Sequence, residues 1–277
     1  MLRKLNENDK MTYNNIVKKH YKEQAEEWGD LASSTMQDEI IRKKETELIL
    51  SFLNIFKRKN LKIADVGCGN GYTLDTLSRQ FPQNNYWGVE FTKELLIIAK
   101  NRKLSNCKFI KGDVRSLNFD ENFFDIVYTQ RCLINILDWK EQKRALSEIQ
   151  RILKPNGCYL MIECFTDGLL NNNKARKECG LTELKEVPHN KYFDKKLLFQ
   201  AMEGKFSIMD PSQFDSDLPP FNFLSSHYFI ARVLHALVTK GGQIKNTEFV
   251  KFFSYLPPIG NYSPLQGYIL KKRGLRC

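Results

Sequence analysis

The chain has 277 residues, of which 42% are apolar and 27% charged, so it can bury a sizeable core and is too apolar for wholesale disorder. Lys and Arg outnumber Asp and Glu by 43 to 32, which gives a formal net charge of +11. The basic residues stand in short scattered groups, which favours a solvated surface over a nucleic-acid footprint.

Neither a membrane segment nor a secretory signal is expected. No apolar stretch approaches the ~18 residues of a membrane span, and residues 1–10 are charged. The 7 cysteines include no Cys-x-x-Cys pair, so the sequence predicts no metal site and indicates a reducing, cytoplasmic setting.

The predicted elements begin with two helices. Residues 11–28 and 36–56 carry apolar residues at helical spacing, and we expect residues 1–58 to form a helical N-terminal cap. Strands and helices then alternate, which favours an α/β fold with a parallel sheet covered on both faces. The expected strands are 61–66, 86–90, 108–111, 124–129 and 158–164, and the expected helices are 71–81, 93–102 and 139–153.

The regular alternation weakens after residue 164. Residues 59–277 are expected to form one domain with insertions near 165–192 and 211–262. The first insertion is polar and rich in Asn, and no helix is predicted in it. The remaining expectations are helices at 193–203 and 225–239, strands at 205–209 and 265–271, and a loop at 211–223.

A glycine-rich loop follows the first predicted strand. Residues 65–71 read Asp-Val-Gly-Cys-Gly-Asn-Gly, and glycines at this place let a ligand lie against the backbone. A P-loop is excluded because Lys-Ser/Thr does not follow Gly71. A dinucleotide fingerprint fits poorly, because the spacing is G-x-G-x-G. S-adenosylmethionine (SAM) is the third ligand class, and Asp65 would attract its positive charges.

Two further acids follow the next strands. Glu90 ends the second strand, where a carboxylate can accept hydrogen bonds from ribose hydroxyls, and Asp113 follows the third, where a carboxylate can accept from an adenine amino group. Three acids at successive strand ends of one sheet edge, beside a glycine loop, predict a nucleoside-binding site.

Residues 61–164 resemble the class I, Rossmann-like SAM-dependent methyltransferases. The likeness rests on the loop at 65–71, on Glu90, on Gly-Asp-Val at 112–114, on Phe-Asp-Ile-Val-Tyr at 124–128 and on Leu-Lys-Pro-Asn-Gly at 153–157. It implies a seven-stranded, mostly parallel sheet and SAM as cofactor. The implied cofactor-binding residues are Tyr21 and Trp28 from the N-terminal helix, Asp65, Gly67, Cys68, Gly69 and Gly71 of the loop, Glu90, Phe91, Asp113 and Val114 around the nucleoside, and Gln130 at the methionine end.

Acceptor-binding residues are sought after the fourth and fifth strands. Arg131 is a candidate clamp for a carboxylate or phosphate, with a structural ion pair as the alternative. The run from Glu163 to Tyr192 is similar to a subgroup of bacterial methyltransferases that modify surface sugars or secondary metabolites, and this likeness adds Glu163, Arg176, His189 and Tyr192. His189 is the predicted general base and His227 the second choice, because histidine titrates near neutral pH.

The sequence therefore predicts methyl transfer from SAM to a small-molecule or glycan-linked acceptor, with hydroxyl oxygen preferred over nitrogen. Three alternatives stay open. The acceptor could be RNA or protein, which the charge of +11 favours. The chain could be a non-catalytic subunit of the same fold, or a nicotinamide dehydrogenase. The oligomeric state is not predicted.

Overall fold

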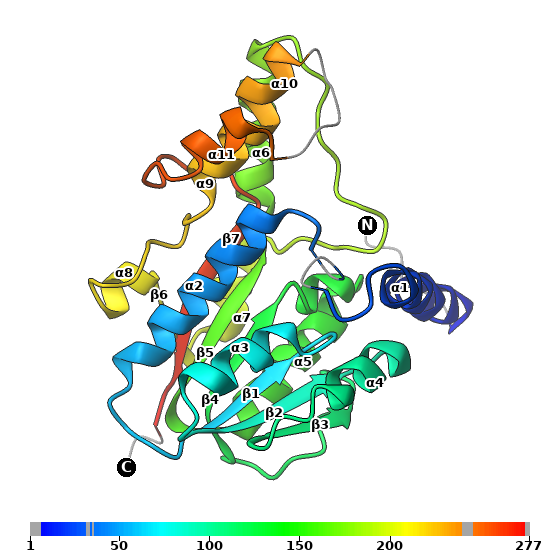
Figure 1. The fold of residues 1–277 in the computed structure, drawn as a ribbon, viewed down its shortest axis with the longest axis vertical. Coiled ribbons are helices and arrows are strands. Elements are labelled where there is room, and N and C mark those ends of the chain that lie inside the picture. The colour runs from blue at the N-terminus through cyan, green and yellow to red at the C-terminus, as the bar shows by residue number, and fades with distance from the viewer. Residues whose placement is uncertain (1–6, 32–33, 35, 240–245, 275–277) are drawn as a thin grey trace.

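The structure, a computed structural model, describes residues 7–31, 34, 36–239 and 246–274. Its centre is a seven-stranded sheet with the strand order β3-β2-β1-β4-β5-β7-β6 (Figure 1). The strands are β1 Lys62–Val66, β2 Asn85–Glu90, β3 Cys107–Lys111, β4 Phe124–Gln130, β5 Leu153–Cys164, β6 Phe206–Met209 and β7 Leu265–Lys272.

The sheet is parallel except at β7, which pairs antiparallel with both β5 and β6. This arrangement confirms the predicted Rossmann-like, mostly parallel sheet of seven strands. The strand order reverses beside β1, which pairs with β2 on one side and with β4 on the other. The carboxyl ends of strands at such a switch point border a crevice, and this is where open α/β sheets bind ligands.

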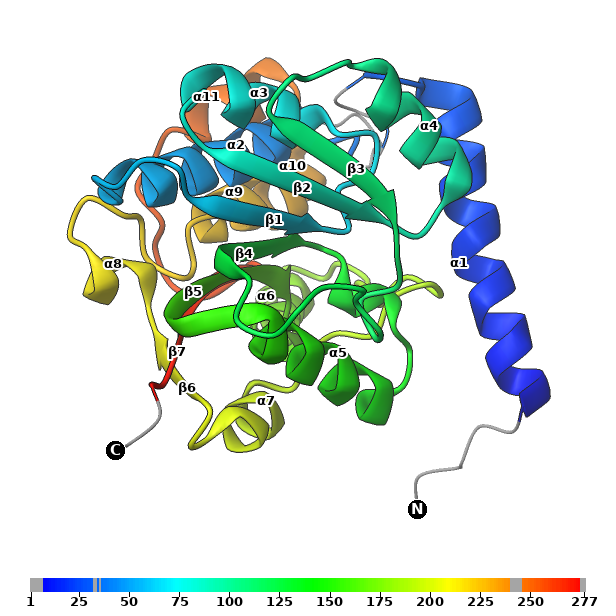
Figure 2. The same cartoon turned by 90° about the horizontal axis from the view of Figure 1, so that it is seen from below.

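Helices cover both faces of the sheet. Figure 2 shows α2 and α3 on one face and α5 and α7 on the other. The helices are α1 Glu7–Trp28, α2 Glu39–Ile55, α3 Tyr72–Gln80, α4 Lys93–Asn101, α5 Trp139–Ile152, α6 Thr166–Glu178, α7 Lys195–Met202, α8 Pro211–Phe214, α9 Ser225–Phe229, α10 His235–Val238 and α11 Glu248–Phe253, with a 3₁₀ turn at η2 Leu133–Asn135 and a π-helical turn at η3 Ile230–Leu234.

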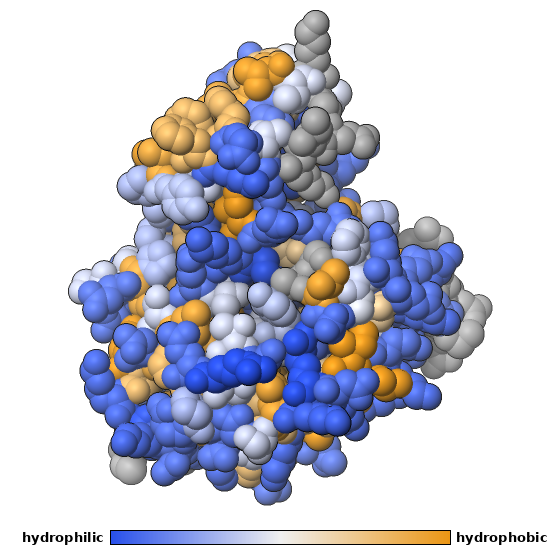
Figure 3. Space-filling model, in the orientation of Figure 1, coloured by the Kyte–Doolittle hydropathy of each residue, from blue (hydrophilic) through white to orange (hydrophobic). Residues whose placement is uncertain are grey.

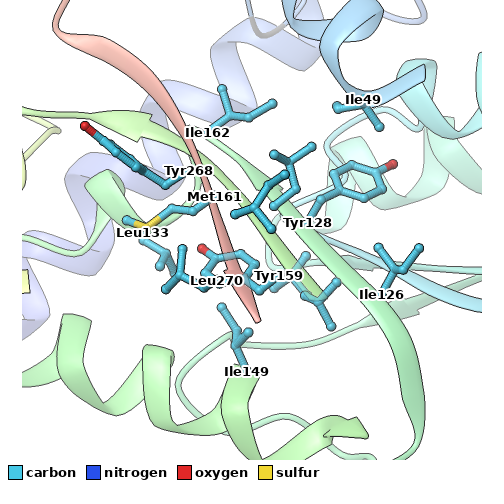
Figure 4. Packing of buried hydrophobic residues seen from close by; sticks show 14 of the residues in the cluster. Ile49, Ile126, Tyr128, Leu133, Ile149, Tyr159, Met161, Ile162, Tyr268 and Leu270 are labelled. Atoms are coloured by element: carbon cyan, nitrogen blue, oxygen red, sulfur yellow. The ribbon is translucent and has the colours of Figure 1, made fainter. Parts of the chain in front are cut away.

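The core lies on both sides of the central strands (Figure 4). Tyr128 of β4 and Tyr159 of β5 are fully buried, Ile49 reaches the sheet from α2, and Ile149 reaches it from α5. Burying an aliphatic or aromatic side chain of this size contributes about 1.5–3 kcal/mol to the free energy of unfolding. Part of the predicted N-terminal cap, helix α2, therefore belongs to the same hydrophobic core as the sheet. The predicted boundary between a cap and a methyltransferase domain at residue 58 stays a prediction.

The first insertion contains a helix that the sequence did not predict. We expected no helix in residues 166–192, but α6 occupies Thr166–Glu178. Its packing uses hydrogen bonds in place of apolar contacts: Asn172 Nδ2 donates to the carbonyl of Tyr262 at 3.0 Å, and a Cβ on Gly168 would meet the Ser263 carbonyl oxygen at 1.9 Å. Because α6 packs through polar groups, its sequence lacks the helical spacing of apolar residues by which a helix is predicted. This explains why the helix was not expected.

The predicted helix at 225–239 is interrupted in the structure. α9 and α10 are joined by the π-helical turn η3, and the Arg176 guanidinium donates to the carbonyl of Arg232 within that turn. The predicted loop at 211–223 also contains the short helix α8. Together α6, α9, η3, α10 and α11 form an upper lobe beyond the edge of the sheet (Figure 1). Of the helices that the structure describes, none combines the length and apolarity needed to cross a membrane.

Candidate active site

A cavity of about 1020 Å³, counting its open mouth, lies at the carboxyl ends of β1, β2 and β4. Its wall combines the glycine loop, the strand ends and side chains from α1 and α2. Among the predicted cofactor residues, Tyr21, Gly67, Cys68, Gly69, Glu90, Phe91, Asp113, Val114 and Gln130 line this wall, whereas Trp28, Asp65 and Gly71 do not.

The glycine loop needs glycine for two different reasons. Gly67, Gly69 and Gly71 have φ of +87°, +54° and +74°, which favour residues without a Cβ. A Cβ on Gly67 would lie 2.6 Å from Cys132 Sγ, so the loop and the segment after β4 approach closely at the cavity. Gly71 instead caps α3, and a Cβ on it would lie 3.1 Å from Ala99 Cβ, away from the wall. Its predicted contact with the ligand is therefore corrected to a packing role.

Glu90 lies between the glycine loop and α4. Its Oε2 accepts from the Gly69 N–H at 2.9 Å and its Oε1 from the Thr92 N–H at 2.7 Å. Burial raises the pKa of Glu90, and these hydrogen bonds oppose that rise. Each carboxylate oxygen has a second lone pair, so Glu90 can still accept from a ligand in the cavity.

Asp113 is held by a neighbouring cation. Its carboxylate accepts a two-pronged hydrogen bond from Arg115, with Nη2 at 2.5 Å and Nε at 2.9 Å. Burial works against ionisation, but the Arg115 hydrogen bonds outweigh it and the pKa of Asp113 is lowered. Phe91 and Val114 line the same part of the wall, which therefore offers an apolar slot with carboxylates beside it.

Among the buried polar atoms that lack a hydrogen-bond partner in the described part of the chain are Asp65 Oδ1 and Gln130 Nε2. Asp65 Oδ2 accepts from the Tyr128 hydroxyl at 2.9 Å, and Gln130 Oε1 accepts from Thr73 Oγ1 at 2.8 Å. Burial raises the pKa of Asp65 to about 7, an effect that the Tyr128 hydrogen bond opposes. Asp65 directly precedes the wall residue Val66 in β1, and Gln130 is itself a wall residue at the end of β4. One acceptor thus remains just behind the wall and one donor on it, and buried polar groups are rarely left unpaired.

Tyr21 comes to the cavity from α1. Asn135 Nδ2 donates to its hydroxyl at 2.8 Å, so α1 is tied to the turn after β4. Burial raises the pKa of Tyr21 to about 12, which keeps the phenol protonated. Trp28 lies on the same helix but not on the cavity wall, which corrects the expectation that it closes the site.

Arg42, which no sequence pattern singled out, lines the cavity from α2. Arg131 lines it too, with a left-handed φ of +51° that is uncommon for a residue with a Cβ. Arg131 also pairs with the fully buried Glu45 of α2, so the structural ion pair named as its alternative is present. No sequence motif marks Arg42, because the contact depends on how α2 packs across the sheet.

Three predicted acceptor residues are engaged elsewhere. Glu163 is fully buried, and its Oε1 accepts from Thr129 Oγ1 at 2.7 Å and from the Cys132 and Leu133 N–H groups at 3.1 Å. His227 Nε2 lies 3.2 Å from Asp38 Oδ2 in the interior. Arg176 Nε donates to the carbonyl of Thr182 at 2.7 Å. These roles are structural, so the predicted acceptor contacts of Glu163, His227 and Arg176 are corrected.

His189 and Tyr192 also lie outside the cavity wall. His189 stacks on His20 of α1 with ring centroids 3.9 Å apart. Its pKa is lowered to about 4 by burial and by the neighbouring His20. Tyr192 packs against the hydrophobic core. His189 thus contacts His20, which precedes the wall residue Tyr21 in the chain, but does not line the wall itself, and this position does not support the role assigned to His189.

Comparison with known proteins identifies the kind of domain. A family model for a methyltransferase domain matches residues 63–157. The chain is 33% identical over 121 residues to an uncharacterised methyltransferase of Schizosaccharomyces pombe, covering 40% of this chain and 42% of that one. It is 35% identical over 109 residues to a demethylmenaquinone methyltransferase of Staphylococcus aureus, covering 38% and 44%. The match thus spans less than half the length of these relatives.

A solved structure extends the likeness to the whole fold. A TehB-like SAM-dependent methyltransferase from Corynebacterium glutamicum superposes with a TM-score of 0.54 at 17% identity, covering 92% of this chain and 99% of that one. The cavity fits the cofactor of such proteins: the unpartnered Gln130 Nε2 on its wall can donate to a carboxylate, and Glu90 has capacity for ribose hydroxyls. Residues 63–157 are therefore a methyltransferase domain of the class I, Rossmann-like type, whose cofactor is S-adenosylmethionine.

Proposed function

We propose that the protein transfers a methyl group from SAM to a small-molecule or glycan-linked acceptor, with SAM bound in the cavity at the carboxyl ends of β1, β2 and β4. The observation that carries this proposal is a pair of unpartnered buried atoms: Gln130 Nε2 on the cavity wall, and Asp65 Oδ1 just behind it, next to the wall residue Val66. An amino-acid tail supplies both complements, since its ammonium donates and its carboxylate accepts. The phosphate of a nucleotide at the same place would supply acceptors alone.

The remaining cofactor contacts follow from the wall. Glu90 would accept from the ribose hydroxyls while the Gly69 N–H holds its carboxylate in place. Phe91 and Val114 would flank the adenine, with Asp113 near its amino group. Arg42 adds a positive charge on the α2 side, which suits the carboxylate of the tail. The residues thus bind and orient a cofactor that carries its own activated methyl group.

The acceptor would lie at the mouth of the cavity, among Tyr21, Arg131 and Asn135. Among the described residues that line the cavity there is no histidine, and Tyr21 keeps its proton because its pKa is raised to about 12. A wall of this kind gives little help in removing a proton. We therefore propose an acceptor hydroxyl that is acidic by itself, such as a phenol, an enol or a carboxylic acid, over a plain alcohol.

The relatives are compatible with several acceptors. The name of the Staphylococcus aureus relative specifies demethylmenaquinone as its acceptor, and the match covers only part of that protein. A nucleic-acid acceptor would require a concentrated basic surface for phosphate contacts, whereas the lysines and arginines of this chain are scattered. The small acceptor is therefore the proposal, and RNA is the alternative that the experiment should distinguish.

The test has two stages. Calorimetry with SAM and with its demethylated product, S-adenosylhomocysteine, measures binding to the full chain, with Gln130→Leu and Asp65→Asn as site variants and Glu121→Gln as an exposed control. Product release is then measured on matched phenols, carboxylic acids, sugars, amines and mixed RNA. The proposal is supported if the wild-type chain binds SAM, the two site variants lose that binding, and the wild-type chain methylates an acceptor with an acidic hydroxyl. Turnover only on RNA would overturn the acceptor class, and absence of SAM binding would overturn the site.

A further inference from the structure

Apolar side chains gather at the end of the upper lobe. Of the 14 exposed large apolar side chains among the described residues, eight lie between positions 234 and 259. Figure 3 shows these elements, α10 and α11, as an apolar area at the protruding end of the molecule. We call this area the apolar tip and define it by Leu237, Val238, Phe249, Phe252, Tyr255 and Ile259.

The exposure of the apolar tip is large for its residue types. Phe252 is 74% exposed and Tyr255 78%, and Val238 and Ile259 are each 68% exposed. Single exposed apolar residues are ordinary, but contiguous groups mark a surface that meets another apolar phase. The apolar tip lies on a protruding part of the molecule (Figure 3), which suits an occupant with a broad surface.

Basic side chains accompany the apolar tip. Lys251 lies on α11 between Phe249 and Phe252, with its side chain 48% exposed and its ammonium 3.1 Å from the exposed Glu248. Lys43 of α2 places its ammonium 5.6 Å from the centre of the Tyr255 ring. Counted on the sequence, residues 225–259 contain four Lys or Arg and one Glu. Aromatic rings and lysines side by side suit the boundary between lipid headgroups and acyl chains.

We propose that the apolar tip docks the protein reversibly on an anionic lipid bilayer. Phe252, Tyr255, Val238 and Ile259 would enter the headgroup boundary while Lys251 and Lys43 face the anionic headgroups. Charge favours this occupant over a second copy, since two chains of +11 each repel and an anionic surface attracts. Interfacial side chains without a covalent lipid give weak and reversible binding, so the attachment depends on anionic lipid and on salt.

The test is sedimentation of the full chain with vesicles of phosphatidylcholine alone or mixed equally with phosphatidylglycerol, at low and high salt. The tip variant is Phe252→Ser with Tyr255→Ser, and Tyr255→Ser alone is a milder second variant. The matched control is Ile97→Ser with Leu197→Ser, which removes exposed apolar side chains from α4 and α7. SAM affinity measured by calorimetry verifies that each variant is folded, because the tip lies outside the cofactor cavity.

Binding to the anionic vesicles, weakened at least about tenfold by the tip variant and by high salt but not by the control, is the expected result. Equal binding by the tip variant would overturn the proposal, as would failure of the wild-type chain to bind. Sedimentation velocity that detects a dimer lost in the tip variant, without vesicle binding, would assign the surface to a second copy instead.

Discussion

Gly69 donates its backbone N–H to Glu90 Oε2 at 2.9 Å, which links the loop after β1 to the end of β2. The glycine loop therefore has two functions: it leaves room for a ligand, and it fixes the carboxylate that the ligand would meet. The Thr92 N–H holds the other carboxylate oxygen at 2.7 Å, so the side chain is oriented before any ligand arrives. Preorganisation of this kind lowers the entropy lost on binding.

Replacing Glu90 tests this relationship. We expect Glu90→Ala to weaken SAM binding by about 1.5–3 kcal/mol, because hydrogen bonds to a charged carboxylate are lost and the Gly69 N–H is left without its acceptor. Calorimetry with SAM measures the change. Glu121→Gln, at an exposed position, should leave the affinity as it is. An unchanged affinity in Glu90→Ala would place the ribose elsewhere.

The raised pKa of Asp65 predicts a pH-dependent affinity. Binding the ammonium of SAM requires the ionised carboxylate, whose pKa in the unliganded protein is about 7. Affinity should therefore increase as the pH rises from about 5.5 to 7.5, by up to tenfold per unit below the pKa. Calorimetry across this range measures it, and Asp65→Asn should bind more weakly with a flat profile. The same slope in the variant would contradict the assignment.

The same pKa predicts how Asp65 affects stability. The folded protein keeps a proton on Asp65 that the unfolded chain releases above its ordinary pKa of 3.8. This contribution to the free energy of unfolding is therefore present at acidic pH and is lost as the pH rises from about 4 to about 7. Urea denaturation of wild type and Asp65→Asn should show the variant gaining relative stability over that interval. A constant difference between the two proteins would contradict the raised pKa.

Glu163 should matter for stability and not for the acceptor. It accepts from Thr129 Oγ1 and from three consecutive backbone N–H groups of residues 132–134, of which only the first, at Cys132, is partly rather than fully buried. Glu163→Ala leaves these donors buried and unsatisfied, which costs roughly 3–5 kcal/mol in the free energy of unfolding. Urea denaturation measures the loss. Glu163→Gln keeps one acceptor oxygen and should lose less; an equally large loss would show that packing volume, and not the hydrogen bonds, is decisive.

His189 should be dispensable for turnover. The ring lies outside the cavity wall and stacks on His20, so His189→Phe keeps the stack and removes the titrating group. The pKa of His189 is lowered to about 4 from 6.5, so its contribution to stability is present above pH 6.5 and is lost as the pH falls toward 4. His189→Phe should therefore gain thermal stability over wild type at pH 5 and not at pH 8.

Two measurements decide the role of His189. Melting temperatures at both pH values test the stacking account, and release of S-adenosylhomocysteine tests catalysis once an acceptor is known. A fall in turnover of about 10²-fold or more, with unchanged SAM affinity, would restore His189 as the general base. Unchanged turnover agrees with a structural role for the stack.

The sheet and much of the cofactor site could be predicted from the sequence because their signals are local. Strand and helix periods alternate between residues 61 and 164, and the structure has the expected elements there. Gly67 and Gly69 follow the end of β1 and Glu90 ends β2, and parallel strands carry their carboxyl ends to one edge regardless of what packs around them. The cavity wall therefore contains residues that could be placed together from the predicted order of the strands, without knowledge of the helix packing.

The contacts of Arg42, Glu163 and His189 were decided only by the tertiary structure. Arg42 reaches the cavity because α2 packs across the sheet, and Glu163 turns inward because the segment after β4 presents three N–H groups to it. His189 lies against α1, whose His20 is 169 positions earlier in the chain. A titratable side chain looks the same in a sequence whether it faces a cavity or a buried partner, because its environment comes from residues far away in the chain.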